Sequence, residues 1–121
     1  MTTRKTVVLG ASPNPERFSY RFVASLVRHG EEVLPLGFRK GSIAGVDIII
    51  GTPALEDIHT VALYLRPDHQ VDFYDYILSL KPVRIIFNPG TYNPELFRMA
   101  QKQGIDTVIN CALVMLAQGI Y

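Results

Sequence analysis

The residues best suited to bind a ligand follow a short apolar run near the amino terminus. Residues 6–9 are mostly β-branched and end at a glycine, which predicts a buried strand. The residues after this run are Gly10, Ala11, Ser12 and Asn14. A glycine lets a ligand approach the backbone closely, and the Ser and Asn side chains offer hydrogen bonds. This combination favours a phosphate or pyrophosphate, although an ordinary strand-to-helix turn can have the same composition.

Arg17 and Ser19 extend the candidate phosphate site. Ser19 is predicted to cap a helix over residues 19–29, and the amino terminus of a helix favours anions. Arg17 adds a cation beside it, or is simply a solvated loop charge. The segment matches neither the G-x-G-x-x-G fingerprint nor a P-loop, so the residues alone leave both interpretations open.

The exit of the second predicted strand, residues 32–36, narrows the class of ligand. A site for NAD places an acidic residue there to bind the ribose hydroxyls. This chain has no acid at that exit and carries Arg39 and Lys40 instead. Two cations suit a nucleotide with an additional ribose phosphate, which is coenzyme A or NADP. A solvated charged loop is the alternative.

These residues need a sheet that brings strand ends together, and the pattern along the chain predicts one. Further strands are expected at residues 60–65, 83–87 and 107–109, with a short strand or hairpin arm within 43–51. Alternation with helices predicts an α/β fold, a three-layer Rossmann-like parallel sheet of about five strands with helices on both faces. Residues 1–121 are expected to form a single domain.

The remaining elements are assigned from helix signals and spacing. Asp68 is predicted to cap a helix over residues 69–80, and Asn93 followed by proline starts one that ends near residue 104. Residues 54–58 are expected to form one weak helical turn. The apolar tail, residues 112–121, is expected to pack against the body.

Ligands bind at the carboxyl ends of the strands in open parallel sheets, so later strand exits add candidates. These candidates are Tyr64, Arg66, Asn88, Pro89 and Gly90. Cys111 follows the last strand and faces the same edge, but a small buried thiol is the simpler interpretation. We find no catalytic motif, no paired carboxylates and no metal-ligand spacing among His29, His59 and His69.

Composition excludes several other classes of protein. The net charge is +1 with scattered basic residues, so a nucleic acid partner is not expected. No apolar run approaches the length of a membrane span. One cysteine and the absence of a signal-like amino terminus favour a cytoplasmic protein. In so short a chain a second copy could cover an exposed edge, so a homodimer is an expected partner, with Tyr74 as a candidate contact.

Four segments together resemble a known family. They are residues 9–20, reading LGASPNPERFSY, residues 34–41, reading LPLGFRKG, and the strand exits at residues 65–67 and 87–90. In this order they resemble the small stand-alone coenzyme-A-binding domain proteins, which are similar to the coenzyme-A-binding domain of the succinyl-CoA synthetase α subunit. The resemblance covers most of the chain. It departs at residues 35–40, where relatives read more like Pro-Val-Asn-Pro-Lys, and in the apolar tail.

The resemblance implies a Rossmann-like fold that binds coenzyme A, and a role for each candidate. Gly10, Ala11 and Ser12 would contact the pyrophosphate, with Arg17 and Ser19 beside it. Lys40 and Arg39 would lie near the ribose phosphate and adenine. Tyr64 and Arg66 would border the adenine side, and Asn88, Pro89 and Gly90 would line the pocket towards the pantetheine arm.

The predicted function is therefore a coenzyme A or acyl-CoA binding protein without evident catalytic machinery. Two alternatives use the same loops. One is a small NADP-dependent reductase, and the other is an interaction subunit with a vestigial nucleotide pocket.

Overall fold

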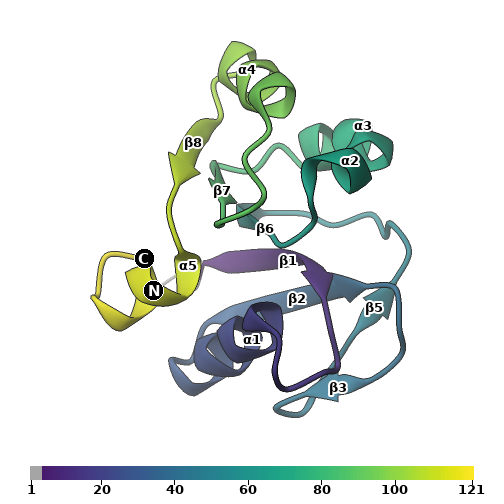
Figure 1. Ribbon diagram of the computed structural model, residues 1–121, viewed down its shortest axis with the longest axis vertical. Coiled ribbons are helices and arrows are strands. Elements are labelled where there is room, and N and C mark those ends of the chain that lie inside the picture. The colour runs from purple at the N-terminus through teal and green to yellow at the C-terminus, as the bar shows by residue number, and fades with distance from the viewer. Residues whose placement is uncertain (1–3) are drawn as a thin grey trace.

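The computed structural model describes residues 4–121 and shows a six-stranded sheet in which every paired strand is parallel (Figure 1). The strands lie in the order β5-β2-β1-β6-β7-β8. Their bounds are Lys5–Ala11 for β1, Glu32–Gly37 for β2, Ile49–Ile50 for β5, Ile58–Leu63 for β6, Arg84–Phe87 for β7 and Asp106–Ile109 for β8. The Rossmann-like α/β fold expected from the sequence is confirmed, and the two-residue β5 is the strand beyond the expected five.

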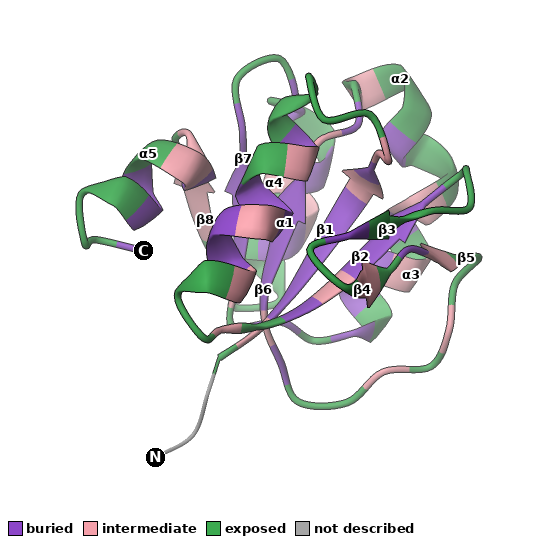
Figure 2. Ribbon diagram, turned by 90° about the horizontal axis from the view of Figure 1, so that it is seen from below, coloured by how far each residue is buried: buried purple, intermediate pink, exposed green. Residues whose placement is uncertain are grey.

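Helices cover both faces of the sheet and complete the three layers. Their bounds are Phe18–Arg28 for α1, Pro67–Gln70 for α2, Tyr74–Ser79 for α3, Pro94–Lys102 for α4 and Ala112–Ala117 for α5. Alternate strand residues feed two cores, so Val7 and Val61 pack with α3 and α4 while Val8 and Ala62 pack with α1 and α5. Figure 2 shows the buried residues concentrated along the central strands between these helices.

Three predicted elements are wrong in their extent. The third strand begins at Ile58 and ends at Leu63, two residues earlier than expected. Residues 54–57 form no helical turn; the backbone there is irregular, with a positive φ of 58° at Asp57. The helix predicted over residues 69–80 is broken into α2, a 3₁₀ turn at Val71–Phe73, and α3.

Two of the three predicted helix caps are also wrong. Arg17 holds the N-cap position of α1, because a turn from its N–H to the carbonyl of Asn14 starts the helix earlier; Ser19 therefore lies buried inside the first turn. Arg66 holds the N-cap position of α2 and Asp68 lies in its first turn. The Asn93 cap of α4 is confirmed, since its Oδ1 accepts from the N–H groups of Glu95 and Leu96.

The segment after β2 and the tail, residues 112–121, were the parts whose structure the sequence defined least, and both contain regular structure. After β2 the chain makes an antiparallel hairpin of β3, Ser42–Ile43, and β4, Val46–Asp47, whose turn has positive φ at residues 44 and 45. The tail forms α5 and then packs the Tyr121 ring against Phe22, as expected of a segment docked on the body.

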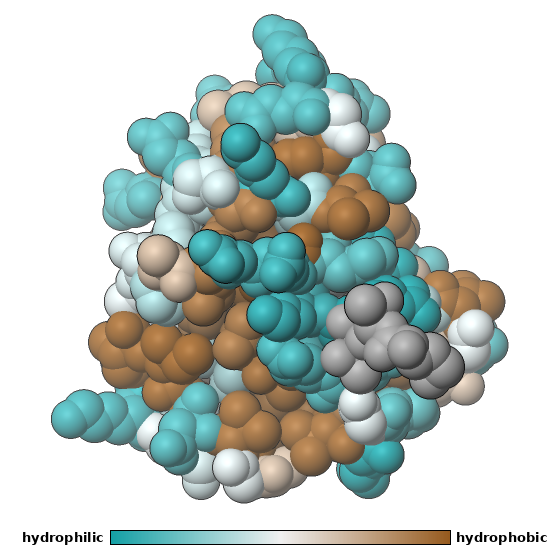
Figure 3. All heavy atoms as spheres, turned by 180° about the vertical axis from the view of Figure 1, so that it is seen from behind, coloured by the Kyte–Doolittle hydropathy of each residue, from teal (hydrophilic) through white to brown (hydrophobic). Residues whose placement is uncertain are grey.

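Tyr74, the candidate dimer contact, lies in the interior of the protein. Its ring is buried and its hydroxyl accepts a hydrogen bond from Nδ2 of Asn93 at 2.7 Å. On the face shown in Figure 3, hydrophilic residues divide the hydrophobic ones into separate groups. A homodimer stays a prediction.

Candidate functional site

A cavity of about 660 Å³ opens at the carboxyl ends of β1, β2 and β6. The chain passes from β1 to β2 on one side and later places β6 on the other, so the strand order reverses here. Crevices at such a reversal are the usual ligand sites of open α/β sheets. The cavity is lined by Gly10, Ala11, Ser12, Pro13, Asn14, Arg17, Phe18, Ser19, Phe38, Arg39, Tyr64, Leu65, His69 and Pro89.

Two glycines let the strand ends approach each other beneath this cavity. Gly10 has a φ of 100°, and a Cβ there would lie 3.0 Å from the backbone carbon of Tyr64. A Cβ on Gly37 would lie 2.3 Å from the carbonyl oxygen of Ala11. Side chains at these positions would push β1 away from its neighbours, so the two glycines allow the close approach of the strand ends at the cavity, which Gly10 itself lines.

The loop after β1 is shaped by its own polar side chains. Oγ of Ser12 accepts from the N–H of Asn14 at 3.1 Å, and Oδ1 of Asn14 accepts from the N–H of Glu16 at 3.0 Å. These bonds leave the Ser12 hydroxyl proton and the Asn14 amide protons as donors. The loop is therefore fixed in shape and still able to donate to an anion.

The cavity is cationic. Arg17 and Arg39 line it, and none of the lining residues drawn from residues 4–121 is acidic. His69 also lines it, with its Nε2 3.8 Å from the Asp68 carboxylate. Neither arginine forms an ion pair with a carboxylate in that part of the chain. The first turn of α1 also contains no acidic residue, so nothing there offsets the positive end of the helix dipole. This electrostatic environment suits a phosphate-bearing ligand.

Apolar rings flank the cationic groups. Phe18 and Phe38 line the cavity, and each has 64% of its surface exposed. Phe38 also packs edge-on against Phe73, with ring centroids 5.9 Å apart. Exposed aromatic rings beside cations suit a ligand that carries both a flat base and phosphates.

The structure brings most of the residues named from the sequence into this lining. They are Gly10, Ala11, Ser12, Asn14, Arg17, Ser19, Arg39, Tyr64 and Pro89. Lining residues that sequence reasoning missed are Pro13, Phe18, Phe38, Leu65 and His69. The signal for the two phenylalanines was present, because each is the chain neighbour of a candidate arginine. His69 carried no signal, since its place depends on the break after α2.

Four named residues lie outside the lining: Lys40, Arg66, Asn88 and Gly90. Lys40 and Gly90 are exposed, and the guanidinium of Arg66 pairs with the Asp68 carboxylate at 3.3 Å. Asn88 is buried; its Nδ2 donates to the carbonyl of Leu63, and its Oδ1 accepts from the N–H of Ala112. The Asn88 side chain thus ties the end of β6 to the start of α5.

Tyr64 differs from the other lining residues because its hydroxyl is buried and has no hydrogen-bond partner within residues 4–121. Burial is the main cause that raises the pKa of this phenol far above its usual value, and the nearby Cys111 and Tyr121 raise it further. The phenol is therefore a neutral donor throughout the physiological pH range.

A second hollow lies at the amino ends of the strands and has a different character. Its lining mixes cations with acids, including Arg4, Lys5, Glu32 and Asp57. Within residues 4–121 no group of three His, Cys, Asp or Glu side chains could hold a metal ion. No helix in that part of the chain is long and apolar enough to cross a membrane.

Comparison with known proteins decides the family. Residues 4–117 match the family described as "CoA binding domain". The chain belongs to this CoA-binding domain family. Membership covers nearly the whole chain and supports coenzyme A binding at the level of the family. A comparison with curated proteins finds no match.

Solved structures agree with this assignment. An uncharacterized protein is 45% identical over 100% of both chains, with a TM-score of 0.95. A protein from Thermus thermophilus is 21% identical over 98% of this chain and 91% of its own, with a TM-score of 0.85. A hypothetical protein from Pyrococcus horikoshii is 23% identical over 98% of this chain and 84% of its own, with a TM-score of 0.84. The last two share the fold of this CoA-binding domain.

Proposed function

We propose that this CoA-binding domain binds coenzyme A or an acyl-CoA in the cavity at the ends of β1, β2 and β6. The observation that carries the proposal is the cavity itself, with its loop donors and its two arginines, and with no acidic side chain from residues 4–121 in its lining. Its volume of about 660 Å³ lies within the range of sites for small molecules and cofactors. Family membership supports the choice of coenzyme A among phosphate-bearing ligands.

The pyrophosphate belongs over the loop at residues 10–14. The backbone at Gly10 and Ala11 lines the cavity, and Ser12 and Asn14 retain donors. The Arg17 guanidinium lies beside them and forms no ion pair within residues 4–121. The start of α1, where Ser19 lies, adds the positive end of the helix dipole.

The nucleoside end belongs near the exit of β2. Arg39 lines the cavity there and is the cation for the ribose phosphate, with Lys40 as its chain neighbour at the rim. The exposed ring of Phe38 and the side chain of Leu65 offer apolar surface to the adenine. Pro89 lies at the opposite end, where the pantetheine arm would leave.

Thermal unfolding with separate additions of coenzyme A, acetyl-CoA, NADP, NAD and ATP tests the proposal. A ligand that binds only the folded state raises the unfolding temperature by mass action. We expect a rise with coenzyme A and acetyl-CoA and none with NAD. A rise with NADP in place of coenzyme A would support the reductase interpretation. No rise with any ligand would refute binding and leave the interaction-subunit interpretation.

Charge reversal locates the ribose phosphate. Arg39→Glu should weaken the binding of coenzyme A about five- to twentyfold, because repulsion of the ribose phosphate replaces one charge-assisted hydrogen bond. Dephospho-coenzyme A lacks that phosphate and should lose much less affinity in the same titration. Arg28→Glu, at the far exposed end of α1, makes the same change in net charge and is the control. Equal losses for both ligands would show that Arg39 does not contact the ribose phosphate.

A further inference from the structure

Tyr64 holds a hydrogen-bond donor that the fold itself leaves unused. The residue lines the cavity, yet its hydroxyl oxygen is buried and meets no partner within residues 4–121. Buried polar groups in folded proteins are nearly always hydrogen-bonded, so an exception asks for an explanation. The other tyrosine hydroxyls in the interior are used: those of Tyr74, Tyr76 and Tyr121 bond to Asn93, Pro53 and Thr6 respectively.

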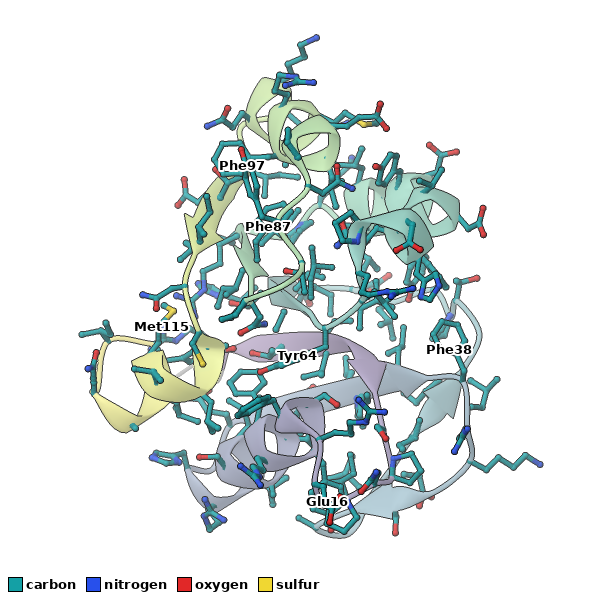
Figure 4. The ribbon with its side chains drawn as sticks, in the orientation of Figure 1. Glu16, Phe38, Tyr64, Phe87, Phe97 and Met115 are labelled. Atoms are coloured by element: carbon teal, nitrogen blue, oxygen red, sulfur yellow. The ribbon has the colours of Figure 1, made fainter. Side chains whose placement is uncertain are left out.

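The direction of the Tyr64 side chain follows from its place after β6. Ala62 faces the core formed by α1 and α5, and Tyr64, two residues later, packs against the same core. Its ring lies 6.0 Å from that of Phe22 of α1. Figure 4 shows Tyr64 in the middle of the molecule, with Phe38 to one side and Met115 of α5 to the other. The phenol therefore points away from the nucleoside end of the cavity.

The layout of the ligand then brings its other arm towards this side chain. The pyrophosphate is proposed over residues 10–14, which follow β1, and the nucleoside is proposed near Phe38 and Arg39, which follow the neighbouring strand β2. Tyr64 follows β6 and Pro89 follows β7, and both strands lie on the other side of β1 from β2. In this layout the pantetheine arm therefore passes Tyr64 on its way towards Pro89.

A change of position breaks no hydrogen bond of the Tyr64 hydroxyl within residues 4–121, and its cost is part of the packing of the ring against Phe22. Side-chain rotations accompany ligand binding in many complexes whose backbone hardly moves. A donor without a partner in residues 4–121 breaks no hydrogen bond there when it turns towards a ligand, whereas the phenol of Tyr76 would break one.

We propose that the Tyr64 hydroxyl donates a hydrogen bond to a carbonyl oxygen of the pantetheine arm and so selects ligands that carry this arm. The assignment rests on the proposed function. It differs from the place at the adenine side that the family resemblance implied for Tyr64. It makes this residue a determinant of specificity at the end of the cavity where an acyl group would be attached.

Calorimetric titration of Tyr64→Phe with two ligands tests the assignment. Coenzyme A carries the arm, and adenosine 3′,5′-bisphosphate carries the nucleoside phosphates without it. We expect the variant to bind coenzyme A roughly three- to tenfold more weakly than the wild type, which is the range for one net hydrogen bond. Its affinity for the bisphosphate should equal that of the wild type. The unfolding temperature of the free variant should be equal or higher, because no hydrogen bond is lost.

Tyr76→Phe is the matched control, since it also removes one phenolic hydroxyl. That hydroxyl donates to the carbonyl of Pro53 at 2.7 Å, so we expect a lower unfolding temperature and unchanged affinity for both ligands. Unchanged coenzyme A affinity in Tyr64→Phe would overturn the assignment while leaving the proposed function intact. If Tyr64→Phe binds both ligands equally more weakly, Tyr64 contacts the nucleoside end of the ligand and not the pantetheine arm. If the wild type binds neither ligand, the proposed function fails and this inference falls with it.

Discussion

Gly10→Ala is expected to destabilise the protein through two separable effects. The first is backbone strain, because a φ of 100° is rarely adopted by a residue with a side chain and costs about 1–3 kcal/mol. The second is crowding, because the new Cβ would lie 3.0 Å from the Tyr64 backbone carbon and 3.1 Å from Cδ2 of Leu65. Overpacking of this kind costs about 1–3 kcal/mol. Together the free energy of unfolding should fall by about 2–6 kcal/mol.

Gly51→Ala separates the two effects. Gly51 has a φ of 97°, almost the same as Gly10, but a Cβ there would meet no atom within 4 Å. Urea unfolding of both variants should therefore show Gly10→Ala to be the less stable by about 1–3 kcal/mol, the crowding contribution alone. If the two variants lose the same free energy of unfolding, β1 does not approach the exit of β6 as closely as described. Gly10→Ala should also bind coenzyme A more weakly, since the crowding displaces the loop that holds the pyrophosphate.

Two further predictions concern polar groups away from the cavity. Asn93→Ala should lower the free energy of unfolding by about 2–4 kcal/mol, because it removes the α4 cap and two bonds from Nδ2 to Gln70 and Tyr74. Asn93→Asp keeps the cap and should lower the free energy of unfolding by less. Equal losses for the two variants in urea unfolding would show that the cap contributes no stability of its own. Burial first, and then repulsion by Arg84, lowers the pKa of His59, so the unfolded chain binds the proton more readily. The free energy of unfolding should therefore fall as the pH decreases below about 6.5, the pKa of an unperturbed histidine. His59→Asn should make this dependence of stability on pH weaker. An unchanged dependence would show that His59 is not its source.

The sequence was sufficient for the architecture because the strands are strongly patterned. Residues 6–9 and 83–87 are dense in β-branched residues, and Asn93 with the following proline is a strong helix start. These local signals agree with the tertiary packing of β1, β7 and α4. Where local preference and tertiary contacts agree, an element can be predicted from the chain alone.

The broken helix after β6 could not be predicted, because its cause is a distant contact. Gln70 at the end of α2 is buried, and its Nε2 donates to the carbonyls of Leu65 and Thr91 at 2.7 and 2.8 Å. Its Oε1 accepts from Asn93. These bonds hold the first turn against the β7 exit, and they place His69 at the cavity. Local periodicity contains no information about partners 21 and 23 residues away.

A position directly after a strand does not by itself identify a residue that lines the cavity, and Asn88 shows why. Residues that follow a strand include some that line the ligand cavity and others that hold the strand ends in place. The Asn88 side chain donates to the carbonyl of Leu63 and accepts from the N–H of Ala112, so it holds the end of β6 against the start of α5. Tyr64 follows β6 directly, and its hydroxyl forms no hydrogen bond with residues 4–121. The hydrogen bonds of each side chain therefore separate the two groups: Asn88 braces the strand ends, whereas Tyr64 is the residue that we propose to recognise the ligand arm.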